Sequence, residues 1–89
     1  MSYEEFKLFI QSLGFVYERQ MMGKESYKLG VFELELRQSF YGAYYEVYQK
    51  VQLGVTRHII KSNARNMNDH ELSVFKSILR EHKLNDLGI

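Results

Sequence analysis

An alternating stretch, "VFELELRQ", restricts the fold of this chain more than any other part of it. Its apolar residues Phe32, Leu34 and Leu36 are separated by charged residues. Successive side chains of a strand point to opposite faces, so the stretch predicts a strand with one buried face and one solvated face. A sheet of this kind buries its apolar face under another layer, which helices can supply.

Two more strands are indicated on either side of this one. Residues 15–22 predict a first strand, and residues 44–54 predict a third. The side chains of the first strand expected to face the core are Phe15, Tyr17 and Met21. Those of the third strand expected to share one face are Tyr45, Val47, Val51 and Leu53. Gly30 interrupts the alternation of the middle strand, residues 26–39, and indicates a bulge or a bend there.

Both ends of the chain have helical patterns. Ser2 and Glu5 have the spacing of a capping box, and an apolar stripe at helical spacing follows them. Asn68 and Glu71 repeat this spacing in front of a second stripe. The stripe residues are Phe6, Phe9, Ile10 and Leu13 in the first helix and Leu72, Phe75, Ile78, Leu79 and His82 in the second. We expect the second helix to end close to Gly88.

Residues 55–67 fit either a strand or a helix. Val55, Ile59 and Ile60 are β-branched, which favours a strand, but the same three residues also fit one helical face. The chain is therefore predicted to be a two-layer α+β domain over residues 1–89, in the order α-β-β-β-α. Its sheet is an antiparallel meander of three strands, or four if residues 55–67 form one, with two helices on one face.

This element order is similar to that of double-stranded-RNA-binding domains. Those domains contact duplex RNA through a loop between strands and through a basic start of the second helix. Here the matching segment, "NARNMNDHE", lacks clustered lysines, and Asp69 and Glu71 lie where phosphates would bind. The resemblance is one of element order, and the sequence assigns the chain to no family.

Composition limits the class of protein. The chain has 89 residues and no cysteine, which excludes disulfides and thiolate metal sites and fits a reducing compartment. No apolar run approaches the roughly 18 residues that a membrane span needs, and the first ten residues lack the pattern of a secretory signal. We therefore expect a cytoplasmic protein with no membrane partner.

The sequence contains no pattern typical of a catalytic or metal site. Its histidines, His58, His70 and His82, lack the spacing of zinc ligands, and its scattered glycines form no phosphate-binding loop. General acid–base catalysis would need a histidine held beside a carboxylate in a cleft. We therefore predict that the protein is not an enzyme and that it uses no cofactor and no metal.

Tyrosines are the first candidates for a binding surface. The chain has seven tyrosines. Alternation places Tyr44 and Tyr48 on the charged face of the third strand and Tyr45 on the opposite face. Tyrosine suits a half-buried strand, and it is also enriched in protein interfaces. We predict a non-catalytic binding module, of the regulator or inhibitor type frequent in phages and mobile elements. Its partner is expected to be a protein or a second copy, bound through Tyr44, Tyr48 and Lys50.

A gap in negative charge suggests an alternative function. Residues 47–68 contain four Lys or Arg residues and no Asp or Glu. Such a stretch could neutralise phosphates, so the alternative is the binding of nucleic acid or another polyanion. The candidate residues are Lys50, Arg57, His58, Lys61 and Arg65. A competing interpretation is that they pair across the sheet with Glu33, Glu35 or Glu46.

Overall fold

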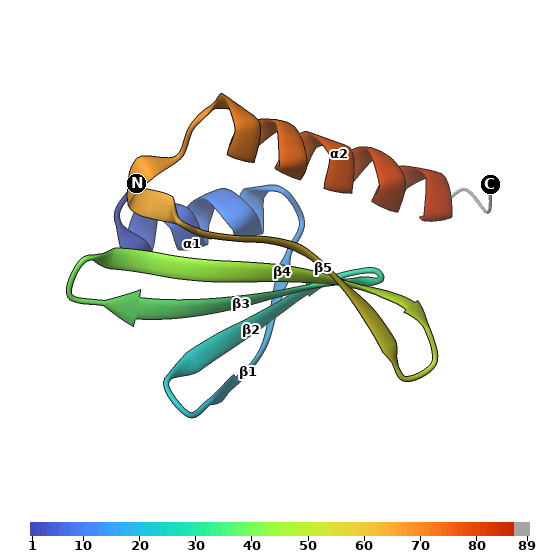
Figure 1. The fold of residues 1–89 in the computed structure, drawn as a ribbon, viewed down its shortest axis with the longest axis horizontal. Helices are drawn as coiled ribbons and strands as arrows, with labels where there is room; N and C mark the ends of the chain where they lie inside the picture. Colours follow the sequence, from blue (N-terminus) through green and yellow to red (C-terminus); the bar gives the residue numbers. More distant parts are fainter. Residues whose placement is uncertain (87–89) are drawn as a thin grey trace.

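The computed structural model describes residues 1–86 and shows two helices on one face of an antiparallel sheet (Figure 1). The elements are α1 (Tyr3–Ser12), β1 (Val16–Met21), β2 (Lys24–Leu29), β3 (Phe32–Ser39), β4 (Gly42–Gln52), β5 (Val55–Asn63), the 3₁₀ helix η1 (Ala64–Asn66) and α2 (Asp69–Asp86). The predicted α+β class, with both helices on one face, is confirmed. The expected helix end at Gly88 lies outside the described residues.

Each strand pairs with its neighbour in the sequence. Within residues 1–86 the sheet has five strands in the order β1-β2-β3-β4-β5, all antiparallel. The meander is therefore confirmed, but it has more strands than the three or four predicted. With five strands in its described part, the chain does not have the α-β-β-β-α element order of double-stranded-RNA-binding domains.

Gly30 separates two strands and does not bend a single one. It has a φ of 59°, and together with Val31 it reverses the chain between β2 and β3, where Leu29 pairs with Phe32. A glycine that breaks an alternating pattern is compatible with a bulge or with a tight turn. The pattern alone does not separate these cases, so one predicted strand became two.

Residues 55–67 are mainly a strand. β5 pairs with β4 and is followed by η1. The pairing satisfies the backbone groups of this segment and places Ile59 and Ile60 against the core. The strand alternative is thus confirmed, and the helical alternative is wrong.

The helices begin as predicted. Ser2 and Glu5 form both hydrogen bonds of a capping box, and Asn68 and Glu71 do the same at the start of α2. Gly14 follows α1 with a φ of 109°, a left-handed conformation that ends the helix. These local signals fix where the covering layer starts and stops.

The core lies between the sheet and the helices. Phe6 and Ile10 of α1 and Phe75 and Ile78 of α2 are buried, as the stripes predict. The other buried apolar residues are Phe15, Tyr27, Leu29, Phe32, Leu34, Leu36, Ala43, Tyr45, Val47 and Ala64. The Phe6 ring stacks on the ring of Tyr45 at 4.7 Å between centroids, so α1 is seated directly on β4.

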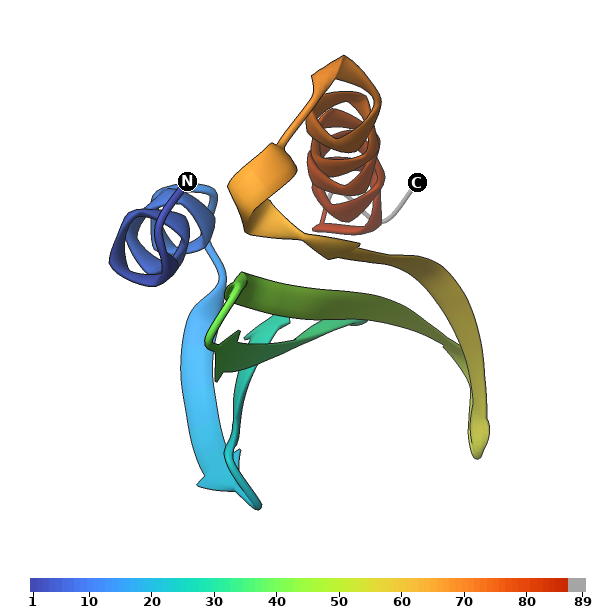
Figure 2. The same ribbon diagram turned by 60° about the vertical axis from the view of Figure 1, so that its left-hand side comes forward.

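Four apolar side chains predicted to face the core are exposed. They are Tyr17, Met21, Val51 and Leu53. All four lie in the hairpins β1–β2 and β4–β5, which curve away from the helices (Figure 2). A bulge between Tyr17 and Arg19 also moves Met21 to the face away from the helices, where it pairs with Lys24. Leu53 lies in the turn between β4 and β5. Alternation predicts the faces of a strand, but not its bulges, its end or how much of it the helices cover.

Candidate functional site

The face of the sheet away from the helices carries the polar residues that alternation predicts, and we call it the open face. These residues are Glu33, Glu35 and Arg37 on β3 and Tyr44, Glu46, Tyr48 and Lys50 on β4. Each of them is exposed or half-buried. The predicted solvated face is therefore confirmed, and it is the surface on which a partner has access to side chains from several strands.

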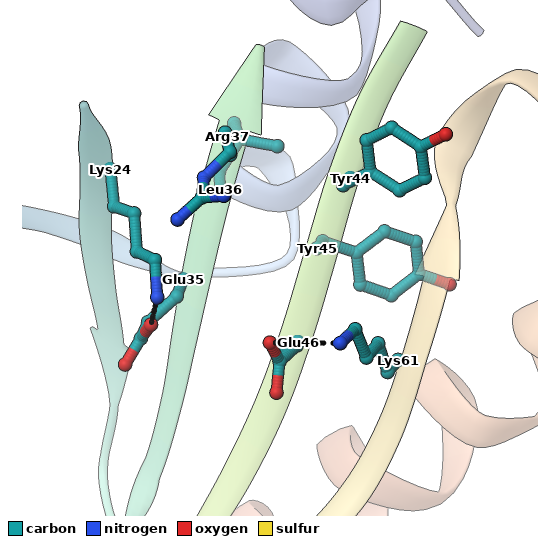
Figure 3. A pocket seen from close by; sticks show the side chains of 8 residues that line it. All are labelled: Lys24, Glu35, Leu36, Arg37, Tyr44, Tyr45, Glu46 and Lys61. Atoms are coloured by element: carbon teal, nitrogen blue, oxygen red, sulfur yellow. Dashed lines mark hydrogen bonds and ion pairs between the residues drawn. The ribbon is translucent and has the colours of Figure 1, made fainter. Parts of the chain in front are cut away.

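A hollow of about 370 Å³ lies in the open face (Figure 3). Its lining residues are Lys24, Glu35, Leu36, Arg37, Tyr44, Tyr45, Glu46 and Lys61. Lys24 Nζ is 3.2 Å from Glu35 Oε2, and Lys61 Nζ is 3.9 Å from Glu46 Oε1. Both carboxylates of the hollow are thus already paired with a lysine.

Arg37 is the third cation of the hollow. Its side chain is exposed, and no carboxylate among the described residues lies within ion-pairing distance of it. It is the cross-strand neighbour of Tyr44, which is 41% exposed. Arginine and tyrosine are two of the residue types that dominate the binding energy of protein interfaces. This pair is the part of the hollow best suited to bind a partner.

Glu46 of β4 contacts side chains of both β4 and β5 on the open face. It accepts a hydrogen bond from the Tyr48 hydroxyl, and its carboxylate lies 3.6 Å from His58 Nε2. The Tyr48 hydrogen bond, helped by the charges of Lys61 and His58, holds the pKa of Glu46 below its usual range. The same bond raises the pKa of Tyr48 to about 12. Glu46 therefore stays ionised and fixes the orientation of its neighbours.

All three predicted partner-binding residues lie on the open face. Tyr44 lines the hollow, and Lys50 is exposed near the β4–β5 turn. Tyr48 is half-buried, because its hydroxyl bonds Glu46 and its ring packs edge-on against His58 with centroids 5.4 Å apart. Tyr44 and Lys50 are roughly 20 Å apart along an extended strand, so one partner would need a broad surface to contact both.

The five predicted polyanion-binding residues do not form one patch. Those on the open face are Lys50, His58 and Lys61. Arg57 lies on the other face, where its Nη2 donates to Gln49 Oε1 at 2.6 Å, and Arg65 lies in η1. The competing interpretation, cross-strand pairing with glutamates, is confirmed at Glu46, which both His58 and Lys61 contact.

Sequence reasoning missed Lys24 as a residue of the hollow. Lys24 lies between the first two expected strands, residues 15–22 and 26–39, but the turn is formed by Met22 and Gly23 and Lys24 is the first residue of β2. Counting back by twos from Ser26 would have placed Lys24 on the open face. The signal was therefore present in the alternation of β2.

The three histidines lie in different parts of the structure. His58 is on the open face, His70 is exposed in the first turn of α2, and His82 packs near Gly30. Among the side chains that the structure describes, no group of three or more His, Asp or Glu could hold a metal ion. The absence of catalysis and of a cofactor stays a prediction.

Comparison with protein-family models, with curated proteins and with solved structures finds no match to this chain. Within residues 1–86, no helix combines the length and the hydrophobicity needed to cross a membrane. The function must therefore be argued from the surface of the molecule itself.

Proposed function

We propose that this chain is a non-catalytic binding module that contacts a protein partner through the hollow of its open face. The partner places an acidic side chain against Arg37 and packs an apolar group on Tyr44. Arginine binds carboxylates through two parallel hydrogen bonds, and the tyrosine ring offers a large contact area with little entropy to lose. Binding of this kind suits a regulator or an inhibitor.

The observation that carries this proposal is the charge balance of the hollow. Its two carboxylates already have lysine partners at 3.2 Å and 3.9 Å, whereas Arg37 has no ion-pair partner among the described residues. The positive charge of Arg37 is thus available to an incoming group. Tyr44 is the cross-strand neighbour of Arg37, and it is 41% exposed.

The test is a comparison of variants on the same face of the sheet. Arg37→Gln and Tyr44→Ala should each weaken partner binding at least about tenfold, because truncation of a central Arg or Tyr typically removes most of the local binding energy. Partner proteins are first captured from lysate of the source cells with the wild-type chain. Their affinities for the variants are then measured by titration with purified partner.

Lys28→Gln is the matched control. Lys28 is exposed on the open face, opposite Glu33, but does not line the hollow. It should leave affinity unchanged, and thermal unfolding should show that all three variants fold. Equal binding by wild type and both hollow variants would contradict the proposal. Sedimentation equilibrium of the same set tells whether the captured partner is a second copy of the chain.

Polyanion binding has less support as a function. Two of its five candidate residues are engaged by Glu46, and Arg57 lies on the helix-covered face. A surface that binds phosphates needs several cations on one side of the molecule. The open face meets this condition only in part, since its carboxylates lie among its cations.

A further inference from the structure

Two hairpin turns lie further from the helices than any other part of the sheet. One joins β1 to β2 and the other joins β4 to β5, and both views show them curving to the side of the open face (Figures 1 and 2). We call residues 21–23 the first tip and residues 51–55 the second tip. A single flat surface can touch both tips, with the open face between them.

The second tip is aliphatic and open to solvent. Leu53 is 103% exposed, and Val51 and Val55 on either side of it are exposed as well. Single exposed aliphatic residues are ordinary on protein surfaces, but a cluster at the end of a projecting hairpin is a contact surface. The turn itself is made by Gly54, with a φ of 76°, so the fold does not require these aliphatic side chains.

The first tip is also apolar and exposed, and its backbone is strained. Met22 is 93% exposed, and its φ of 51° places a non-glycine residue in the left-handed region. Asn or Gly at this position would adopt the same turn with less strain. Met22 gains no burial in return, and Met21 beside it is also exposed. An apolar side chain here has no role in the fold that the structure shows.

Cations stand behind both tips. They are Lys50 and Arg57 behind the second tip, on opposite faces of its hairpin, and Arg19 and Lys24 behind the first. Lys24 is also paired with Glu35, at 3.2 Å. The second tip has no acidic neighbour on its hairpin beyond Glu46, since residues 47–68 contain none. Near the first tip, the Glu25 carboxylate is 3.3 Å from Lys7 of α1, and Glu18 is next to Arg19 in sequence. The second tip is thus the more basic of the two.

We propose that the two tips dock this domain on an anionic lipid surface, with Leu53 and Met22 inserted among the lipids. Lys50 is three residues from Leu53, or roughly 10 Å along a strand. Amphipathic segments enter the interface to a depth of about 5–10 Å, so Lys50 would lie at the level of the headgroup phosphates. Its long side chain can reach them while its backbone stays at the membrane surface. Contact of this kind requires no spanning segment, and the proposal replaces the expectation from the sequence that the protein has no membrane partner.

At each tip the apolar side chains project furthest and the cations lie behind them. This arrangement favours a lipid surface over a nucleic acid or a second copy of the chain. A nucleic acid would meet the aliphatic side chains first, and these neither pair with phosphates nor stack on bases. A second copy that met this one tip to tip would bring Lys50 and Arg57 close to the same cations of its partner. In a lipid surface the apolar groups enter first and the cations follow, which is the arrangement seen here.

The experiment uses the whole chain with two kinds of vesicle. Sedimentation with vesicles of phosphatidylcholine mixed with phosphatidylserine should show binding at low salt that weakens as salt is added, and phosphatidylcholine alone should bind less. Leu53→Asp should lower the partition coefficient at least about tenfold, because a carboxylate replaces the inserted side chain. Met22→Asp should lower it in the same direction.

Phe40→Asp is the control for exposed apolar area. Phe40 is 96% exposed in the β3–β4 turn, away from both tips, so its replacement should leave vesicle binding unchanged. A loss equal to that of Leu53→Asp would overturn the proposal. So would the absence of binding to anionic vesicles at low salt. Binding of duplex DNA or RNA in place of vesicles would assign the cations to a nucleic acid and would also overturn it.

A fluorescent residue reports insertion directly. The chain has no tryptophan, so Leu53→Trp and Phe40→Trp each provide a single emitter at a matched, fully exposed position. Emission of Leu53→Trp should shift to the blue with anionic vesicles, and that of Phe40→Trp should not. The absence of a shift in Leu53→Trp would contradict insertion. Neither readout depends on Arg37 or Tyr44, so the two proposals succeed or fail separately.

Discussion

Glu71 shows how one residue joins three elements. It is 5% exposed, and it accepts hydrogen bonds from the Asn68 N–H at 3.2 Å and from the Ser62 hydroxyl of β5. It also lies close enough to Tyr45 of β4 to help burial raise the pKa of that phenol. The capping box predicts Glu71 at the start of a helix, but its burial follows from the way α2 is seated on the sheet, which local spacing does not specify.

We expect Glu71→Ala to lower the free energy of unfolding by about 1–3 kcal/mol, because it removes a buried acceptor that both Asn68 and Ser62 use. Glu71→Gln should cost less, since an amide oxygen can still accept a hydrogen bond. The matched control is Glu5→Ala, which removes the same residue from the capping box of α1 at an exposed position. Urea unfolding of the three variants gives the comparison, and equal losses at the two helices would contradict a role for burial.

At the scale of elements, α2 presses on the sheet at the β2–β3 turn. An added Cβ at Gly30 would lie 2.5 Å from His82 Nδ1 of α2. At Gly54, which has a similar positive φ, no described atom lies within 4 Å of an added Cβ. The two glycines thus share a backbone requirement and differ in their contact with a helix.

Gly54→Ala should lower stability by about 1 kcal/mol through the left-handed backbone alone. Gly30→Ala should lower it by roughly 1 kcal/mol more, because the His82 ring must move. Thermal or urea unfolding of both variants separates the two effects. The same loss in both would mean that α2 does not hold this turn.

Much of this element pattern could be predicted from the sequence. The caps, the helical stripes and the two faces of β3 and β4 depend on neighbours a few residues away. The open face with Tyr44 and Glu46 was therefore predicted, whereas the exposure of Leu53 was not, because Leu53 lies in the turn beyond the end of β4. The grouping of His58 with Lys61 beside Glu46 depends on a bulge in β4–β5 pairing, since strict alternation would place them on opposite faces.

At the scale of the whole molecule, the tyrosines link stability to alkaline pH. Burial is the main cause that raises the pKa of Tyr27 and Tyr45, and the hydrogen bond to Glu46 raises the pKa of Tyr48 to about 12. In the unfolded chain a tyrosine ionises near pH 10. Because the folded state binds these protons more tightly, the stability they contribute is complete below about pH 10 and is lost as pH rises through the folded values.

The melting temperature should therefore fall steadily above about pH 10. Tyr45→Phe keeps the buried ring and removes one ionising group, so its melting temperature should fall less steeply over the same range. Its hydroxyl donates a weak hydrogen bond to the thioether of Met67, at 3.7 Å, so the variant should still fold. A parallel fall in wild type and Tyr45→Phe would contradict the assignment.

The strictly sequential meander has a consequence for how the protein forms. Every strand pairs with the strand next to it in the chain, so each step of sheet growth closes only a short loop and loses little chain entropy. The four hairpins can therefore form one after another. Contacts between residues distant in the sequence form when the helices dock on the sheet. The tips, outside that docked region, are the places where an evolving chain can lengthen or shorten a hairpin without shifting the register of the rest.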